Sequence, residues 1–379
     1  MYTNDFVRRM QSPGGERRRG RSMHIDIPLL LTLIVLCLGG LMVLYSASGQ
    51  SAFYVKRQAF FMLAGFVAMI LVAQFPVRFW ERYAVLFYGI GLLSLVLVLF
   101  FGVGAKGAQR WLDLGFTRLQ PSELMKVAVP LMISAYLGKR PIPPSFNHIA
   151  VTLLLIALPV FLIVEQPDLG TSILIFAAGF FVLFLAGLRK RYLIGTFLLA
   201  LAAIPSLWFF VMRDYQKQRV LTLLSPEDDK LGAGWNIIQS TTAIGSGGLN
   251  GKGWTMGTQS QLNFLPESHT DFIIAVLAEE FGLIGVLTLC TAYLLLIGRC
   301  MVIALNSQSQ FGRLIAGSLS LTFFIYVFVN MSMVSGILPV VGVPLPLISY
   351  GGTAIVTLFL GFGILMAIST EPKRIRIDL

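Results

Sequence analysis

Long apolar stretches most constrain how this chain can fold. Runs such as IPLLLTLIVLCLGGLMVLY (27–45) and YAVLFYGIGLLSLVLVLFFGV (83–103) recur along its 379 residues. About ten segments approach the ~20 residues that an α-helix needs to cross a bilayer. Only 12% of the residues are charged, about half of the ~25% found in soluble domains. We therefore predict an all-α polytopic membrane protein with about ten transmembrane helices.

The basic residues predict how these helices are oriented. With a cytoplasmic N-terminus, both tails and the basic loops all face the cytoplasm, as the positive-inside rule expects. These pieces hold most of the 29 Lys and Arg residues. We therefore attribute the net charge of +11 to the orientation of the chain in the membrane rather than to nucleic-acid binding. Both termini are then cytoplasmic, and a large extracytoplasmic loop over about 212–270 separates helices seven and eight. The predicted units are a tail over 1–24, a transmembrane domain over 25–370 and a tail over 371–379.

Polar residues in segment 103–127, on the predicted outer side, resemble a helix start. Glu123 follows Pro121 in the expected first turn, where a carboxylate complements the helix dipole. Lys126 lies three residues later, so the two side chains share a helix face and can pair. A capped helix with a satisfied ion pair explains this pattern as well as a functional site does.

Two further outer segments interrupt the apolar pattern. Asp168, in the short connection 164–172, either caps the next helix or contributes to a pocket. The proline- and glycine-rich segment 336–352 breaks the backbone at membrane depth, and Ser349 lies at its edge. Such backbone is tolerated only where it lines a cavity or is buried in protein.

The long outer loop contains a cluster of glycines between 245 and 257, with Lys252 among them and Arg219 upstream. Successive N–H groups of such a cluster can form an anion-binding nest. Flexible loops have the same composition, so this signal is weak by itself.

Acidic residues run from this loop into the next apolar segment. Pro266 predicts the start of a helix with Asp271 in its first turn, where a carboxylate contributes about 0.3–1 kcal/mol through the helix dipole. That role does not explain Glu279 and Glu280 further along, which must face partners, water or another chain. We assign Asp271 to the mouth of a water-accessible outer cavity, and the two glutamates to organising the helices beneath it.

Cations and backbone amides suit a phosphate or diphosphate. A carboxylate beside them suits a general base that accepts a proton from an attacking hydroxyl group. A diphosphate leaves readily, so no second acid is required, whereas glycosidases need a carboxylate pair. These residues therefore fit glycosyl transfer from a lipid-linked diphosphate, although the inference has low specificity.

Seven motifs follow one another along the chain: KGAQRWLDLG, LQPSELMKVAVP, EQPDLGTSI, QRVLTLLSPEDDKLGAGWNIIQS, AIGSGGLNGKGW, GTQSQLNFLPESHTDFIIAVLAEE and SGILPVVGVPLPLISYGGT. Together they resemble the motifs of the SEDS family (shape, elongation, division and sporulation). Each is weak alone, but their order is specific and covers nearly the whole chain after the basic tail. The first and sixth motifs resemble the elongation branch of the family rather than the division branch.

The resemblance implies a peptidoglycan glycosyltransferase that polymerises lipid II, an undecaprenyl-diphosphate-linked donor and acceptor, during cell elongation and rod-shape maintenance. It implies the bacterial cytoplasmic (inner) membrane, with the active site facing the periplasm. The implied partners are a class B penicillin-binding protein, of the penicillin-binding protein 2 type, and other membrane proteins of the elongation complex. A divalent cation, Mg²⁺ or Mn²⁺, is compatible with a leaving diphosphate, although the sequence shows no cluster with metal-ligand spacing.

The resemblance also assigns residues. Asp271 matches the family's essential aspartate and is the expected base for the acceptor 4-hydroxyl in an inverting transfer. Glu123, Lys126 and Asp168 match supporting motif residues. Substrate binding is assigned to Lys106, Arg110, Arg219, Lys252 and Ser349.

Two alternatives remain from the residues. Broken helices and intramembrane acids would also suit a lipid II flippase, and a non-catalytic scaffold of the elongation complex would make Asp271 dispensable. The polar groups cluster in the outer half only, which disfavours alternating access.

Overall fold

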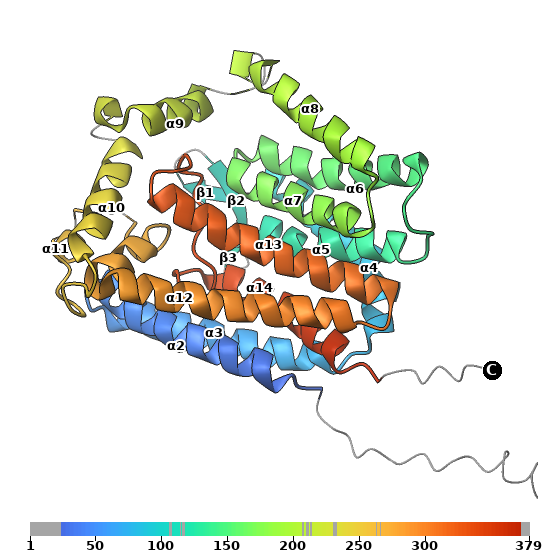
Figure 1. Cartoon of the computed structure of the whole chain (residues 1–379), viewed down its shortest axis with the longest axis horizontal. Coiled ribbons are helices and arrows are strands. Elements are labelled where there is room, and N and C mark those ends of the chain that lie inside the picture. The colour runs from blue at the N-terminus through green and yellow to red at the C-terminus, as the bar shows by residue number, and fades with distance from the viewer. Residues whose placement is uncertain are drawn as a thin grey trace, which may run out of the picture.

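The chain forms a bundle of long helices with a small sheet and short helices at one end (Figure 1). This computed structural model describes residues 24–105, 108–113, 115, 118–206, 208–209, 212, 214–229, 233–262, 264–265 and 267–372. Seven of the described helices are long and apolar enough to cross a membrane: α2 (Ile27–Ala47), α3 (Ala52–Ala73), α4 (Val77–Phe101), α6 (Phe146–Glu165), α12 (Ile273–Asn306), α13 (Gln310–Val334) and α14 (Gly352–Ser369). The predicted all-α polytopic fold is confirmed.

Three further helices have 17 residues each: α5 (Pro121–Leu137), α7 (Leu169–Leu185) and α8 (Lys190–Ser206). They lie at the short end of the ~17–25 residues that span a bilayer. The count of ten transmembrane helices therefore stays a prediction. The predicted domain limits stay predictions too.

The large loop predicted between helices seven and eight is folded. It contains α9 (Asp214–Leu224), the 3₁₀ helix η2 (Pro226–Asp229), α10 (Ala233–Gly247) and α11 (Thr258–Gln261), grouped at the same end of the bundle as the sheet (Figure 1). The sheet has the order β1-β2-β3 and is antiparallel, with β1 at Val103–Ala105, β2 at Ala108–Asp113 and β3 at Arg118–Leu119. The sequence patterns did not predict this sheet.

The start of α12 differs from its prediction. A helix beginning at Pro266 was expected, but α12 begins at Ile273, and the turn over 267–272 precedes it. Glu267 has a φ of 54°, a left-handed conformation that cannot continue a right-handed helix. Asp271 therefore lies in a turn before the helix rather than in its first turn.

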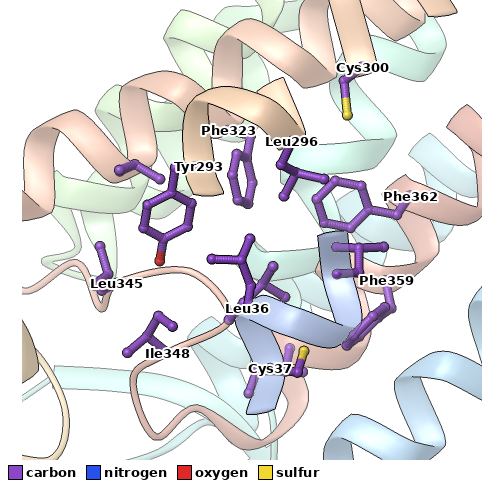
Figure 2. Close-up of a cluster of buried hydrophobic side chains, with 14 of the residues drawn as sticks. Leu36, Cys37, Tyr293, Leu296, Cys300, Phe323, Leu345, Ile348, Phe359 and Phe362 are labelled. Carbon is purple, nitrogen blue, oxygen red and sulfur yellow. The ribbon is translucent and has the colours of Figure 1, made fainter. Parts of the chain in front are cut away.

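Buried apolar side chains hold the central helices together (Figure 2). The cluster joins α2, α12, α13 and α14 to the irregular segment 335–351, through Leu36, Cys37, Tyr293, Leu296, Cys300, Phe323, Leu345, Ile348, Phe359 and Phe362. The hydroxyl of the fully buried Tyr293 donates to the carbonyl of Pro346 at 2.6 Å. The core thus fixes an irregular segment that would otherwise leave polar backbone unsatisfied in the membrane.

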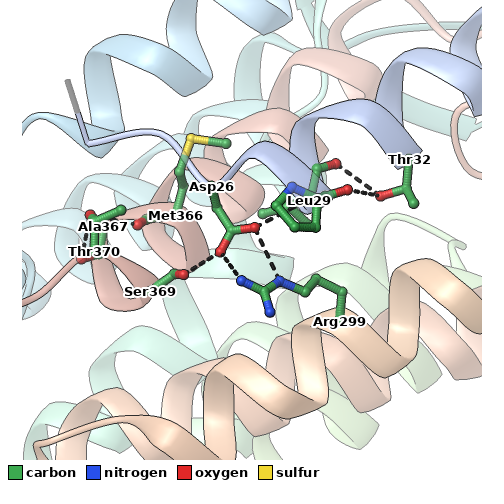
Figure 3. Close-up of polar contacts among 9 residues, drawn as sticks. Asp26, Leu29, Thr32, Arg299, Met366, Ala367, Ser369 and Thr370 are labelled. Carbon is green, nitrogen blue, oxygen red and sulfur yellow. Dashed lines mark hydrogen bonds and ion pairs between the residues drawn. The ribbon is translucent and has the colours of Figure 1, made fainter. Parts of the chain in front are cut away.

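At the other end of the bundle, one carboxylate joins three helices (Figure 3). Asp26 caps α2 by accepting the Leu29 N–H at 3.0 Å, and Arg299 of α12 donates to both of its oxygens, at 3.1 and 2.6 Å. The hydroxyl of Ser369, at the end of α14, donates to the same carboxylate. Asp26 is buried, whereas the Arg299 side chain is 32% exposed.

We expect Asp26→Asn to lower the free energy of unfolding by about 1–3 kcal/mol, because charge-assisted hydrogen bonds are lost and partial exposure of Arg299 moderates the effect.

Burial alone would raise the pKa of Asp26, but hydrogen bonds from Arg299, Ser369 and Leu29 outweigh it and lower the pKa below 3.8. The carboxylate therefore stabilises the fold fully at pH values above the pKa that Asp26 has in the unfolded chain. This contribution is lost as the pH falls through the lower pKa that Asp26 has in the folded protein.

Thermal unfolding of detergent-solubilised protein from pH 7 downwards measures both effects. Glu81→Gln is the matched control, since Glu81 forms a more exposed pair with Lys139 at 3.9 Å. Equal melting temperatures for Asp26→Asn and Glu81→Gln at pH 7 would contradict the role of Asp26.

Candidate active site

A cavity of about 760 Å³ lies between the small sheet and the neighbouring helix ends. The sheet contributes Arg110 and Arg118 to its wall, α3 contributes Arg57, and α13 contributes Tyr326. Phe61, Trp111, Asp113 and Gly115 also line it. The rest of the lining comes from helix starts and from the irregular segment, namely Gln120, Glu123, Lys126, Asp168, Thr171, Thr270, Asp271, Gly342, Val343, Pro344 and Tyr350 to Ala354. Helical segments far apart in sequence therefore meet at one polar cavity.

Four helix N-termini converge on this cavity, since the lining includes the starts of α5, α7 and α14 and the turn just before α12. The N–H groups of a first helical turn have no partner within the helix, and the helix dipole places partial positive charge there. The caps of α5, α12 and α14 make no side-chain hydrogen bond. The arrangement therefore favours an anionic ligand.

Glu123 and Lys126 form the ion pair that their spacing predicts. Lys126 Nζ lies 2.7 Å from Glu123 Oε1 and 3.2 Å from the Tyr326 hydroxyl, and it also lies over the Tyr326 ring. Both charged residues are buried. Removing one partner of such a buried pair leaves an uncompensated charge. The contact of Lys126 with Tyr326 joins α5 to α13 in the cavity wall.

Asp168 combines the two roles that its sequence position left open. Its Oδ1 accepts the Thr171 N–H at 3.2 Å and thereby caps α7. Its Oδ2 accepts from the Gln120 amide at 3.3 Å and lies 3.9 Å from Arg110 Nε. Arg110 also donates to the carbonyl of Pro167. The cap therefore anchors a cation in the cavity wall.

Asp271 lies in the turn before α12, half-buried and lining the cavity. Its backbone carbonyl accepts the Asn330 amide at 2.9 Å. Gly342, with a φ of 75°, faces the carboxylate, and a Cβ atom added there would lie 3.7 Å from Asp271 Oδ2. The structure thus brings five of the predicted site residues to one cavity: Arg110, Glu123, Lys126, Asp168 and Asp271.

A family model described as "Cell cycle protein", which covers FtsW, RodA and SpoVE proteins, matches residues 25–374. The chain belongs to the SEDS family. Its relatives include peptidoglycan glycosyltransferase MrdB of Escherichia coli K12, 54% identical over 93% of this chain and 95% of the relative. A probable peptidoglycan glycosyltransferase FtsW of Geobacter metallireducens is 38% identical over 92% and 95%.

Two solved structures share the fold of this SEDS chain. One, from a study of how a peptidoglycan synthase complex coordinates polymerisation and crosslinking, superposes with a TM-score of 0.80 at 32% identity, covering 91% of this chain and 97% of the other. The other is the rod shape-determining protein RodA of Thermus thermophilus, with a TM-score of 0.69 at 29% identity, covering 91% and 96%.

Three other predicted substrate-binding residues, Arg219, Lys252 and Ser349, are not part of the cavity lining of this SEDS chain. Lys252 Nζ donates to Glu279 Oε1 and to the Thr258 hydroxyl, both at 2.8 Å. Arg219 lies on α9, and Ser349 is buried behind the wall. Lys106 lies outside the described residues. Their assignments to substrate binding stay predictions.

Glu279 and Glu280 organise the structure beneath the cavity, as predicted. Glu279 is fully buried and accepts the backbone N–H groups of Gln259 and Ser260 at 3.0 and 3.3 Å, so it caps α11. Glu280 accepts the hydroxyl of Ser46 at the end of α2. The two glutamates therefore tie the loop and α2 to α12 and contribute no side chain to the cavity lining.

The glycine cluster pairs with α12 instead of forming an anion-binding nest. Gly282 interrupts α12 with a φ of 64° and a ψ of −161°. The loop supplies the missing partners, since the N–H groups of Lys252 and Gly253 donate to the carbonyls of Glu279 and Glu280, both at 3.0 Å. Because these two N–H groups are already used, the nest prediction is wrong for them.

Gly251→Ala tests the junction between the glycine-rich loop and α12 that these backbone hydrogen bonds form. Gly251 has a φ of 77°, and a Cβ atom there would lie 2.1 Å from the Glu280 carbonyl oxygen. We expect the substitution to lower the free energy of unfolding by roughly 2 kcal/mol or more, through backbone strain and steric overlap. Thermal unfolding measures the loss.

Gly245→Ala is the control, because this exposed glycine of α10 has open space around its Cβ position. Alanine in a helix is favoured over glycine by roughly 0.5–1 kcal/mol, so the control should be neutral or stabilising. Similar melting temperatures for the two variants would refute the junction.

Sequence reasoning missed two residues of the cavity lining, Arg57 and Tyr326, and the buried Asn330, which hydrogen-bonds to the turn that carries Asp271. Arg57 lies in α3, three residues before the apolar run that begins at Phe60, and a charge beside that run was the available signal. Tyr326 and Asn330 of α13 had no such signal, because one Tyr or Asn in an apolar helix is compatible with many roles.

Proposed function

We propose that this chain is a peptidoglycan glycosyltransferase of the RodA type, which polymerises lipid II into glycan strands at the periplasmic face of the inner membrane. The observation that carries the proposal is the cavity that joins Asp271 to Arg57, Arg110 and Arg118 at converging helix N-termini. The name of the 54%-identical relative, peptidoglycan glycosyltransferase MrdB, supports it. So does the likeness to RodA.

The step that we propose is an inverting transfer at the anomeric carbon of the donor. The acceptor 4-hydroxyl oxygen forms the new bond to that carbon while the bond to the diphosphate oxygen breaks. Asp271 accepts the hydroxyl proton as general base, a role typically worth 10²–10⁴-fold in rate. The bonding electron pair leaves with the diphosphate, so no covalent enzyme intermediate forms.

The leaving diphosphate needs positive charge near its oxygens. Arg110 and Arg118 each lie 3.9 Å from one carboxylate, Asp168 and Asp113 respectively. These long, partly solvated pairs leave guanidinium N–H groups available, and the arginine fork fits phosphate oxygens. The start of α14 adds backbone N–H groups at Gly352 and Thr353. Together these groups stabilise the charge that develops as the diphosphate departs.

A divalent cation stays a prediction. Among the described residues, no group of three or more His, Cys, Asp and Glu side chains lies close enough to hold a metal ion. The proposed step does not pass through a metal ion.

A class B penicillin-binding protein, of the penicillin-binding protein 2 type, is the proposed partner, along with other elongation-complex membrane proteins. The likeness to a chain from a peptidoglycan synthase complex that polymerises and crosslinks supports this assignment. A polymerase and a transpeptidase together perform those two reactions.

Asp271→Asn tests the proposed base. The amide keeps the shape of the side chain but cannot accept the proton, so we expect lipid II polymerisation by the purified chain with its partner to fall at least ~10²-fold. Gel analysis of glycan strands made from labelled lipid II measures this. Folding and partner binding should be unchanged.

Unimpaired strand synthesis by Asp271→Asn would eliminate the general-base assignment. Transport of lipid II across liposomes without strand growth by the wild-type chain would support the flippase instead. A chain that does neither, yet stimulates its partner, would support the scaffold.

Arg110→Ala and Lys252→Ala separate substrate binding from structure. Arg110 lines the cavity, so its loss should raise the KM for lipid II or lower kcat by about 10-fold or more, as expected for a lost charge-assisted contact. Lys252 is committed to Glu279, so its loss should instead lower the melting temperature. The reverse pattern would return Lys252 to substrate binding.

A further inference from the structure

Three successive carbonyl groups of the turn before α12 each accept a hydrogen bond from a different donor. In order, the bonds are Tyr350 N–H to His269 at 2.9 Å, Ser349 hydroxyl to Thr270 at 2.5 Å, and Asn330 amide to Asp271 at 2.9 Å. Since the turn belongs to no helix or sheet, it has no regular hydrogen-bond ladder of its own. These three bonds tie the turn to α13 and to the irregular segment 335–351.

Asn330 fixes the backbone on both sides of the proposed base. It is fully buried on α13, and its amide nitrogen also donates to the carbonyl of Val343 at 2.7 Å. Val343 follows Gly342, whose α-carbon faces Asp271 Oδ2. One planar amide group therefore sets the spacing between the turn that carries Asp271 and the segment against which its carboxylate lies.

The second donor, Ser349, is itself held in place. Its hydroxyl accepts the Leu345 N–H at 2.8 Å, which directs its proton towards Thr270. The buried Gln58 of α3 donates to the Ser349 carbonyl at 2.8 Å and accepts the Gly351 N–H at 3.2 Å. The hydrogen bonds that hold the turn thus extend from α13 through the irregular segment to α3.

We propose that Asn330, supported by Ser349, is a positioning residue that directs the Asp271 carboxylate at the acceptor hydroxyl. The inference rests on the proposed function. It gives Ser349 a role behind the cavity wall rather than in contact with substrate. A catalytic group displaced by about 1 Å can lose roughly 10²-fold in rate, so small movements of this turn are sufficient.

The test is steady-state polymerisation of lipid II by Asn330→Ala and Asn330→Asp with the partner present. Alanine removes both donated bonds, and aspartate keeps the volume but points acceptor oxygens at two carbonyls. We expect kcat to fall about 10- to 100-fold while the KM for lipid II stays within about threefold. A purely structural residue would instead lower the amount of folded protein and leave kcat per folded molecule unchanged.

Ser318→Ala is the matched control. Its buried hydroxyl, on the same helix, donates to the Ala178 carbonyl of α7 at 2.7 Å. It lies about 18 Å along α13 from Asn330 at ~1.5 Å per residue, so kcat should stay near the wild-type value. An equal loss of kcat in Ser318→Ala would overturn the positioning role.

Asp271→Asn, measured alongside, separates this inference from the proposed function. Activity in Asp271→Asn would refute the proposed function. An inactive Asp271→Asn beside fully active Asn330 variants would refute the positioning role alone. If Asn330→Ala does not fold, Asn330→Asp and Ser349→Ala decide by the same kcat criterion. Failure of all three to fold would show a structural role and overturn the inference.

Discussion

Backbone that leaves regular structure near a bilayer must find its hydrogen-bond partners inside the protein, and this constraint shapes the whole cavity end of the molecule. Within the described part of the chain, such breaks include Gly282 of α12 and the segment 335–351. The glycine-rich loop satisfies the first through Lys252 and Gly253. Buried side chains satisfy the second, among them Tyr293 and Asn330. Irregular main chain can therefore line a polar cavity without exposing unpaired groups to lipid.

The same constraint explains the division of labour among the acids. The carboxylate oxygens of Glu279 and Asp168 accept backbone N–H groups at the N-termini of α11 and α7, so these two acids stabilise the local structure. Glu123 is neutralised by Lys126 at 2.7 Å. Asp271 instead lies in a turn whose backbone carbonyl accepts a hydrogen bond from Asn330, and it lines the cavity. The backbone bond thus constrains the turn that carries the proposed base.

Much of this was predictable, because apolar length, charge distribution and helix-start chemistry are local properties. They predicted the membrane class, the Glu123–Lys126 pair and the cap at Asp168. The small sheet, the start of α12 and the use of Lys252 depend on contacts between distant segments. Glu267 at positive φ and the pairing of residue 252 with 279 leave no periodic pattern in the sequence. The resemblance named Asp271, but only the fold shows which cations accompany it.

The convergence of helix starts also bears on why the cavity suits diphosphate rather than a neutral sugar alone. Three of the lining acids have a lining cation within 4 Å, so the side-chain charges nearly cancel there. The helix dipoles and Arg57 are then parts of the field that these pairs do not neutralise. Positive potential from backbone costs no side-chain entropy and moves little when charge develops, as electrostatic preorganisation requires. An anionic leaving group is stabilised by such a field in the transition state, whereas a neutral sugar ring gains little from it.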